Sequence, residues 1–172
     1  MSKQIKKFVS KESYKHSCAK DVLYNLLIEA EKENNNELYA SVGQIKWRPN
    51  YGIFKELVFY NTSTGYYFET SKGLKEGLNG NIENQDEAFI ENFDRGYPLF
   101  VPDITIFHKG MAIYFIEIIN TNDVNDKKLN KIKSFAEREG YYPHIIKVKA
   151  DDILNINIGD KIKKLKCEII DL

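Results

Sequence analysis

Cysteine is scarce in this sequence. The 172 residues include two cysteines, Cys18 and Cys167, which lie far apart and form no CxxC pair. A structural zinc site needs four ligands, usually supplied by cysteine and histidine, so these two residues do not make one by themselves. We expect both to be free thiols of a protein that stays in a reducing compartment.

Long hydrophobic runs are also absent. No apolar segment approaches the ~20 residues that a membrane-spanning helix requires. The opening residues, MSKQIKKFVSKES, lack the apolar region of a secretory signal peptide. We therefore expect an intracellular, cytoplasmic protein that does not enter a membrane.

An excess of one charge sign is missing as well, because 25 lysines and arginines balance 25 aspartates and glutamates. Such a chain has no overall basic field, so any contact with nucleic acid must come from a local patch. The candidates are DKKLNKIK at 126–133 and KIKKLKC at 161–167. Solvated faces are one interpretation of these lysine runs, and phosphate contact is the functional one.

The chain does contain enough apolar material for a core, since 42% of its residues are hydrophobic and 13% are aromatic. We expect one globular domain over residues 1–172, with residues 1–12 flexible. Apolar residues at helical spacing predict an amphipathic helix over 13–33, with Ser13 as its N-cap and the asparagine run at 34–36 as its stop signal. The apolar stripe consists of Ala19, Val22, Leu23, Leu26, Leu27 and Ala30. Short alternating runs rich in valine, isoleucine, phenylalanine and tyrosine predict an antiparallel meander over 38–70, and a short helix is expected at 85–93.

Residues 99–149 are expected to form the centre of the domain, in the order strand, strand, helix, strand. A turn at 108–110 joins the first two strands, Asn125 or Asp126 caps the helix, and Gly140 ends it. A crossover helix between two strands implies one parallel pair. The sequence thus predicts an α/β fold with a mixed, mainly antiparallel β-sheet flanked by α-helices.

Two carboxylates, Asp103 and Glu117, lie in the apolar strands on either side of that turn. Strands joined near 108–110 place these side chains roughly opposite each other. Bare carboxylates would repel, and burial would raise at least one pKa, whereas a divalent cation such as Mg²⁺ removes the conflict. The alternative is a solvent-exposed strand end, with surface pairs to Lys109 or Arg95.

Pro102-Asp103, a short hairpin, Glu117 near a strand end and a following helix resemble the PD-(D/E)XK nuclease superfamily. The resemblance implies a restriction-endonuclease-like fold and DNA as the substrate. It also implies a Mg²⁺ or Mn²⁺ ion held by Asp103, Glu117 and the backbone carbonyl of Ile118. A homodimer is a further implication, because many nucleases of this fold act as dimers.

Four short segments also resemble the predicted nuclease domain of competence protein CoiA-like families. They are KHSCAKDVLYNLL, PDITIF, IEIINTNDVNDKKLNKI and YPHIIKVKADDI. These families show an H-x-x-A-K helix, a PD strand, an E-I-x-x-T-[HN] segment and a following D-x-x-K. Beyond the PD pair, the counterparts in this chain are His16, Ala19 and Lys20, then Glu117, Ile118, Thr121 and Asn122, and finally Lys127 or Lys128.

One residue departs from the superfamily pattern. The motif lysine belongs two positions after the glutamate, where this chain has Ile119. Either Lys20 or Lys128 takes over its role, or the site is inactive. The resemblance gives His16 a phosphate or acid–base contact and Lys20 the stabilisation of phosphate charge, while a solvated helix start is the alternative for both.

The sequence therefore predicts a metal-dependent DNA endonuclease, a phosphodiesterase that cleaves with the help of Mg²⁺ or Mn²⁺. The predicted catalytic residues are Asp103, Glu117, Lys20, Lys128 and His16. The alternative is a catalytically inactive module of the nuclease fold that binds nucleic acid or a protein partner.

Overall fold

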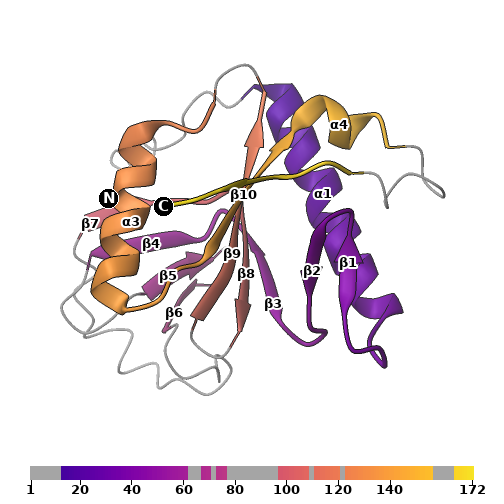
Figure 1. The fold of residues 1–172 in the computed structure, drawn as a ribbon, viewed down its shortest axis with the longest axis horizontal. Coiled ribbons are helices and arrows are strands. Elements are labelled where there is room, and N and C mark those ends of the chain that lie inside the picture. The colour runs from indigo at the N-terminus through magenta and orange to yellow at the C-terminus, as the bar shows by residue number, and fades with distance from the viewer. Residues whose placement is uncertain are drawn as a thin grey trace.

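The computed structural model describes residues 13–61, 67–70, 73–76, 97–108, 111–120, 123–156 and 165–172. Within these ranges the chain forms a single mixed α/β domain with three helices and a five-stranded, mostly antiparallel central sheet (Figure 1). The predicted flexible segment 1–12 and the predicted helix 85–93 lie outside the described residues. The elements are α1 (Tyr14–Glu33), β1 (Ala40–Val42), β2 (Ile45–Trp47), β3 (Gly52–Lys55), β4 (Val58–Asn61), β5 (Tyr67–Thr70), β6 (Gly73–Glu76), β7 (Tyr97–Phe100), β8 (Ile104–His108), β9 (Met111–Ile119), α3 (Asp126–Glu139), β10 (His144–Lys149), α4 (Ala150–Leu154) and β11 (Glu168–Ile170).

Helix α1 begins and ends where the sequence predicts. The Ser13 side chain caps it by accepting a hydrogen bond from the backbone N–H of His16, and Asn34 is the C-cap. One face packs into the core through Ala19, Leu23, Leu27 and Ala30. The expected apolar stripe is wrong at one position, since Val22 is exposed.

The predicted meander over 38–70 is confirmed for the antiparallel pairs β1–β2 and β4–β5 but is wrong as a single sheet, because its strands belong to three different sheets. Strands β1 and β2 form a separate hairpin, β3 joins the edge of the central sheet, and β4 and β5 lie in a sheet of order β6-β5-β4-β7. Asn50 and Glu56, in the turns before and after β3, have φ values of 71° and 52°. These left-handed residues redirect the chain between sheets, which strand periodicity does not reveal.

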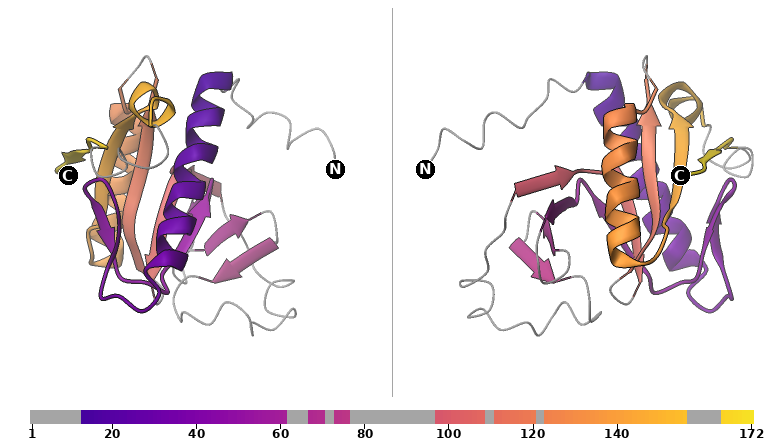
Figure 2. Two further views of the ribbon diagram at one scale, coloured as in Figure 1. Left: turned by 90° about the vertical axis from the view of Figure 1, so that its right-hand side faces the viewer. Right: turned by 60° about the vertical axis from the view of Figure 1, so that its left-hand side comes forward.

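The central sheet has the order β11-β10-β9-β8-β3. Strands β9 and β10 are parallel, with α3 between them in sequence, and the other pairs are antiparallel. This arrangement confirms the expected crossover and the mixed, mainly antiparallel sheet. Helices α1 and α3 cover opposite faces of the sheet, each above its own apolar cluster (Figure 2).

Helix α3 confirms the predicted start and stop signals. The Asn125 side chain accepts a hydrogen bond from the backbone N–H of Lys127, and Gly140 ends the helix in the left-handed conformation with φ 76°. The buried face of α3 includes Ile132 and Phe135, which pack against the aromatic side of the sheet. The caps thus fix where the first turn of α3 lies relative to the end of β9.

The cysteines and the hydrophobicity of the helices can also be compared with the sequence prediction. Both cysteines, Cys18 and Cys167, are free. Among the residues that the structure describes, no helix has the length and apolar character needed to cross a bilayer.

Candidate functional site

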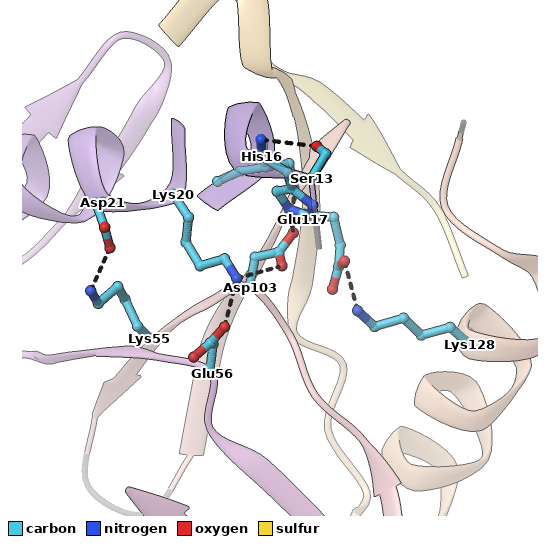
Figure 3. Close-up of polar contacts among 10 residues, drawn as sticks. Ser13, His16, Lys20, Asp21, Lys55, Glu56, Asp103, Glu117 and Lys128 are labelled. Atoms are coloured by element: carbon cyan, nitrogen blue, oxygen red, sulfur yellow. Dashed lines mark hydrogen bonds and ion pairs between the residues drawn. The ribbon is translucent and has the colours of Figure 1, made fainter. Parts of the chain in front are cut away.

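The two predicted carboxylates meet at one end of strands β8 and β9 (Figure 3). Asp103 directly precedes β8, and Glu117 lies near the end of β9. The pairing of Ile104 with Ile116 in the antiparallel ladder brings the two acidic residues to neighbouring positions. Their side chains are only 13% and 7% exposed, so the alternative of surface pairs at a solvent-exposed strand end is wrong.

Asp103 is held by donors from two elements. Its Oδ2 accepts hydrogen bonds from the backbone N–H of Ile118 at 2.8 Å and from Nε2 of His16 at 3.1 Å. Burial opposes ionisation of this carboxyl, but these hydrogen bonds and the charges of His16 and Lys128 outweigh it and lower its pKa below the ordinary value. Asp103 is therefore a fixed, ionised carboxylate.

Glu117 is in the opposite electrostatic situation. Burial, with a smaller contribution from the charge of Asp103, raises its pKa to about 7 even though Lys128 lowers it. Its Oε2 accepts a hydrogen bond from Nζ of Lys128 at 2.7 Å. Its Oε1 is buried and has no hydrogen-bond partner among the described residues. A buried carboxylate oxygen without a partner is unfavourable, which makes it available to a ligand that can enter.

The two predicted lysines approach the carboxylates from opposite faces of the sheet. Lys20 comes from α1, and its Nζ lies 3.7 Å from Oδ1 of Asp103, while Lys128 comes from the first turns of α3 and binds Glu117. Their side chains are 5% and 25% exposed. The alternative of a solvated helix start is therefore wrong for Lys20, and His16 contacts Asp103 directly. The fold thus brings together all five side chains predicted as catalytic.

Two contacts at the site lie outside the sequence prediction. Oε1 of Glu56 accepts a hydrogen bond from Nζ of Lys20 at 2.7 Å. Nδ2 of Asn120, just after β9, donates to Oγ of Ser13 at 2.9 Å and so ties the strand end to the start of α1. Ser13 was recognisable as a cap, but nothing in the residue pattern around Glu56 distinguishes it from an ordinary turn residue.

The site offers the kind of ligand atom that a divalent cation prefers, but it offers few of them. Carboxylate oxygens are the ligands that Mg²⁺ prefers, and Oε1 of Glu117 lacks a partner among the described residues. The part of the chain that the structure describes holds no group of three or more histidine, cysteine, aspartate or glutamate residues arranged around a metal. The protein ligands would then be the two carboxylates and the predicted carbonyl of Ile118, with water and substrate completing the shell.

A separate cavity of about 680 Å³ lies between the start of α3 and strand β11. Lys147 lines it and already pairs with Asp123 at 3.0 Å and with Glu168 at 3.1 Å. The carboxylate pair differs from this cavity because Oε1 of Glu117 is buried there without a hydrogen-bond partner among the described residues.

Comparison with known proteins adds no relative to these observations. No protein family, no curated protein and no solved structure matches this chain. The resemblance to PD-(D/E)XK nucleases therefore stays a prediction from the sequence, and the case for a function depends on the side chains of the site itself.

Proposed function

We propose that this protein is a metal-dependent DNA endonuclease of the PD-(D/E)XK type, a phosphodiesterase with a restriction-endonuclease-like fold. One observation carries the proposal: Asp103 and Glu117 converge in a nearly buried position with an ammonium group beside each. Charged side chains are seldom buried unless they are paired, and burying them carries a high desolvation cost, so two nearly buried carboxylates side by side are an unusual arrangement. Such groupings with strongly perturbed pKa values are typical of functional sites.

The balance of charge at the site also supports this reaction. Asp103, Glu117 and Glu56 are three carboxylates, and Lys20 and Lys128 are two ammonium groups. With all five ionised, these groups carry one net negative charge. A single divalent cation and one phosphodiester would bring the sum to zero, so the site is suited to bind both together.

The residues would divide the work as follows. Asp103, Glu117 and the carbonyl of Ile118 would hold Mg²⁺ or Mn²⁺, which when bound polarises the phosphate and lowers the pKa of a water molecule. Lys20 would stabilise the negative charge that develops on the phosphate oxygens, in place of the lysine absent at Ile119. Lys128, paired with Glu117 in this structure, is the second candidate for that role.

His16 would transfer a proton in the reaction, whereas the lysines would stabilise negative charge on the phosphate. Its Nε2 lies 3.1 Å from Oδ2 of Asp103, so the carboxylate fixes the orientation of the imidazole ring. A histidine held in this way can move a proton near neutral pH, either from the attacking water or to the leaving oxygen. The ring is about one-quarter exposed, which leaves it accessible to a substrate at the surface.

The topology supports the fold that we propose. The order β8, β9, α3, β10, with a parallel β9–β10 pair beside an antiparallel β8–β9 pair, is the arrangement expected for a restriction-endonuclease-like core. Helix α3 begins with the lysine run 127–133, which includes Lys128 of the site, and its exposed members Lys127 and Lys133 would favour contact with the DNA backbone. A homodimer is part of the proposal, and sedimentation equilibrium tests it.

A second candidate function is an inactive module of the same fold that binds nucleic acid or a protein partner. Ile119 favours it, because isoleucine can neither position a water molecule nor stabilise charge on phosphate. The ion pair between Lys128 and Glu117 favours it as well, since an ammonium group already neutralises one of the carboxylates. In such a module the site would be a stable remnant without a metal.

Cleavage assays separate the two candidates. The full chain is incubated with plasmid and with single-stranded DNA in Mg²⁺, in Mn²⁺ and in EDTA. We expect metal-dependent cleavage that Asp103→Asn and Glu117→Gln abolish and that Asp21→Asn retains. Asp21 is the matched control because it forms a 2.6 Å pair with Lys55 next to the site but at the surface (Figure 3).

Retention of DNA without cleavage in either metal would establish the inactive binding module instead. If the protein neither binds nor cleaves DNA, both nucleic-acid proposals are wrong and a protein partner becomes the remaining candidate.

A further inference from the structure

Glu56 contacts two residues of the site from the turn between β3 and β4. Its backbone N–H donates to the carbonyl oxygen of Asp103 at 3.0 Å, and its Oε1 accepts from Nζ of Lys20 at 2.7 Å. In Figure 3 the ammonium group of Lys20 lies between the carboxylates of Glu56 and Asp103. One turn residue thus holds both the backbone of one site residue and the side chain of another.

The backbone of Glu56 is unusual for a residue with a side chain. Its φ is 52°, in the left-handed region, and the only other non-glycine residue with a positive φ among the described residues is Asn50. Asparagine tolerates this region, and glycine enters it without steric cost, whereas glutamate does so less readily. Residues held in such conformations cluster at functional sites, where the surrounding structure compensates for the strain.

The exposure of the pair shows which partner depends on the other. The side chain of Lys20 is 5% exposed, and that of Glu56 is 59% exposed. A buried ammonium group needs acceptors, and Glu56 supplies one from the solvent side. The pair therefore fixes Nζ of Lys20 at 3.7 Å from Oδ1 of Asp103 while leaving the carboxylate of Glu56 accessible.

We infer that Glu56 is a positioning residue that holds the ammonium group of Lys20 beside Asp103, where the scissile phosphate would bind. The identity of that phosphate rests on the proposed function, whereas the positioning itself does not. Glu56 touches neither the metal ligands' side chains nor the predicted carbonyl of Ile118, so it acts on the reaction through Lys20. A glycine at this turn would adopt the same backbone conformation without steric cost but would remove the carboxylate that accepts from Nζ of Lys20 at 2.7 Å.

Glu56→Gly is the most direct test, because glycine adopts the left-handed backbone conformation readily while the side chain, with its carboxylate, is removed. In the cleavage assay we expect kcat to fall by about 10²-fold, the size of loss typical of a misplaced catalytic group, with KM nearly unchanged. In a Lys20→Met background the same substitution should cause no further loss, because its effect passes through Lys20. Glu56→Gln keeps an acceptor and should restore part of the rate.

Two controls separate positioning from general effects. Asn50→Gly relieves the other left-handed turn, and Asp21→Asn breaks the neighbouring pair with Lys55. Both should leave kcat within about twofold of the wild type, the change expected from a surface substitution. Equal losses of kcat in Glu56→Gly and Asn50→Gly, or an undiminished loss in the Lys20→Met background, would overturn the inference.

A second measurement does not depend on catalysis. Limited acetylation of the metal-free protein with acetic anhydride, followed by peptide mass spectrometry, reports how readily each lysine reacts. We expect Lys20 to react several-fold faster in Glu56→Gly than in the wild type, because it loses its acceptor and its cover. An unchanged rate at Lys20 refutes the positioning. Absence of wild-type cleavage refutes the proposed function alone, and the acetylation result then decides the role of Glu56.

Discussion

Glu117 should make the metal-free protein lose stability as the pH rises from 4.5 towards about 7. Burial raises the pKa of this carboxyl from 4.5 to about 7 in the folded protein, so between these values the folded chain binds a proton that the unfolded chain has released. Stability falls with pH wherever the folded state binds more protons. The contribution is fully present below pH 4.5 and is lost as the pH passes through about 7.

The magnitude follows from the same two values. Each pH unit between them corresponds to ~1.4 kcal/mol, so the interval from 4.5 to about 7 corresponds to a loss of about 3 kcal/mol. The substitution Glu117→Gln keeps the shape of the side chain and an acceptor for Lys128 but cannot ionise. The free energy of unfolding of this variant should therefore lack the loss, and the variant should be the more stable protein above pH 7.

Urea unfolding in EDTA between pH 4.5 and pH 8 measures this difference. The difference between Glu117→Gln and the wild type should grow by about 3 kcal/mol across the interval, while Glu37→Gln, at an exposed position, should follow the wild type. Addition of Mg²⁺ should stabilise the wild type above pH 7 and leave Glu117→Gln unchanged, because the ion binds the ionised carboxylate. A difference that stays constant from pH 4.5 to pH 8 refutes the reasoning.

Three further substitutions test the site and the core. Lys128→Met removes a positive charge 2.7 Å from Oε2 of Glu117. At a pH high enough to ionise Glu117 in both proteins, calorimetric titration should therefore show about tenfold tighter Mg²⁺ binding, and the exposed Lys127→Met should show little change. Ser13→Ala removes the N-cap of α1 and should lower the free energy of unfolding by about 1 kcal/mol in urea, against no measurable change for the exposed Ser41→Ala. Phe115→Ala leaves a cavity at a fully buried position and should lower the free energy of unfolding by about 4 kcal/mol. A loss under about 1 kcal/mol would contradict the packing described for β9.

Local signals predicted helices α1 and α3 and the central strands β8, β9 and β10. The side chains of Ser13 and Asn125 accept hydrogen bonds from backbone N–H groups in the first turns of their helices. Gly140 ends α3 because its backbone adopts the left-handed conformation. These interactions span a few residues, so they can be recognised in the sequence. The hairpin of β8 and β9 is similarly local, and its register brought Asp103 and Glu117 together as expected.

The prediction of one meander over 38–70 was wrong because strand pairing, unlike capping, can depend on residues distant in sequence. Periodicity identified most of its strands, and the neighbouring pairs β1–β2 and β4–β5 are antiparallel as a meander requires. It did not reveal that β3 pairs with β8 and that β4 also pairs with β7, because both partners are distant in sequence. The left-handed turn at Glu56 that separates β3 from β4 carries no glycine to mark it. The residue pattern therefore predicts neither the turn at Glu56 nor its contact with Lys20.

The amino-acid sequence alone singled out the carboxylates, lysines and histidine that we propose for the chemistry, and the expected hairpin was enough to predict that Asp103 and Glu117 lie at neighbouring positions of the β8–β9 hairpin. The tertiary structure decided how the charges are paired: Lys20 of α1 lies beside Asp103 and Glu56, and Lys128 of α3 lies beside Glu117. The physical reason is that pKa values and ion pairs depend on burial and on contacts between α1, α3 and the sheet. Those contacts join residues far apart in the chain, and no local pattern records them.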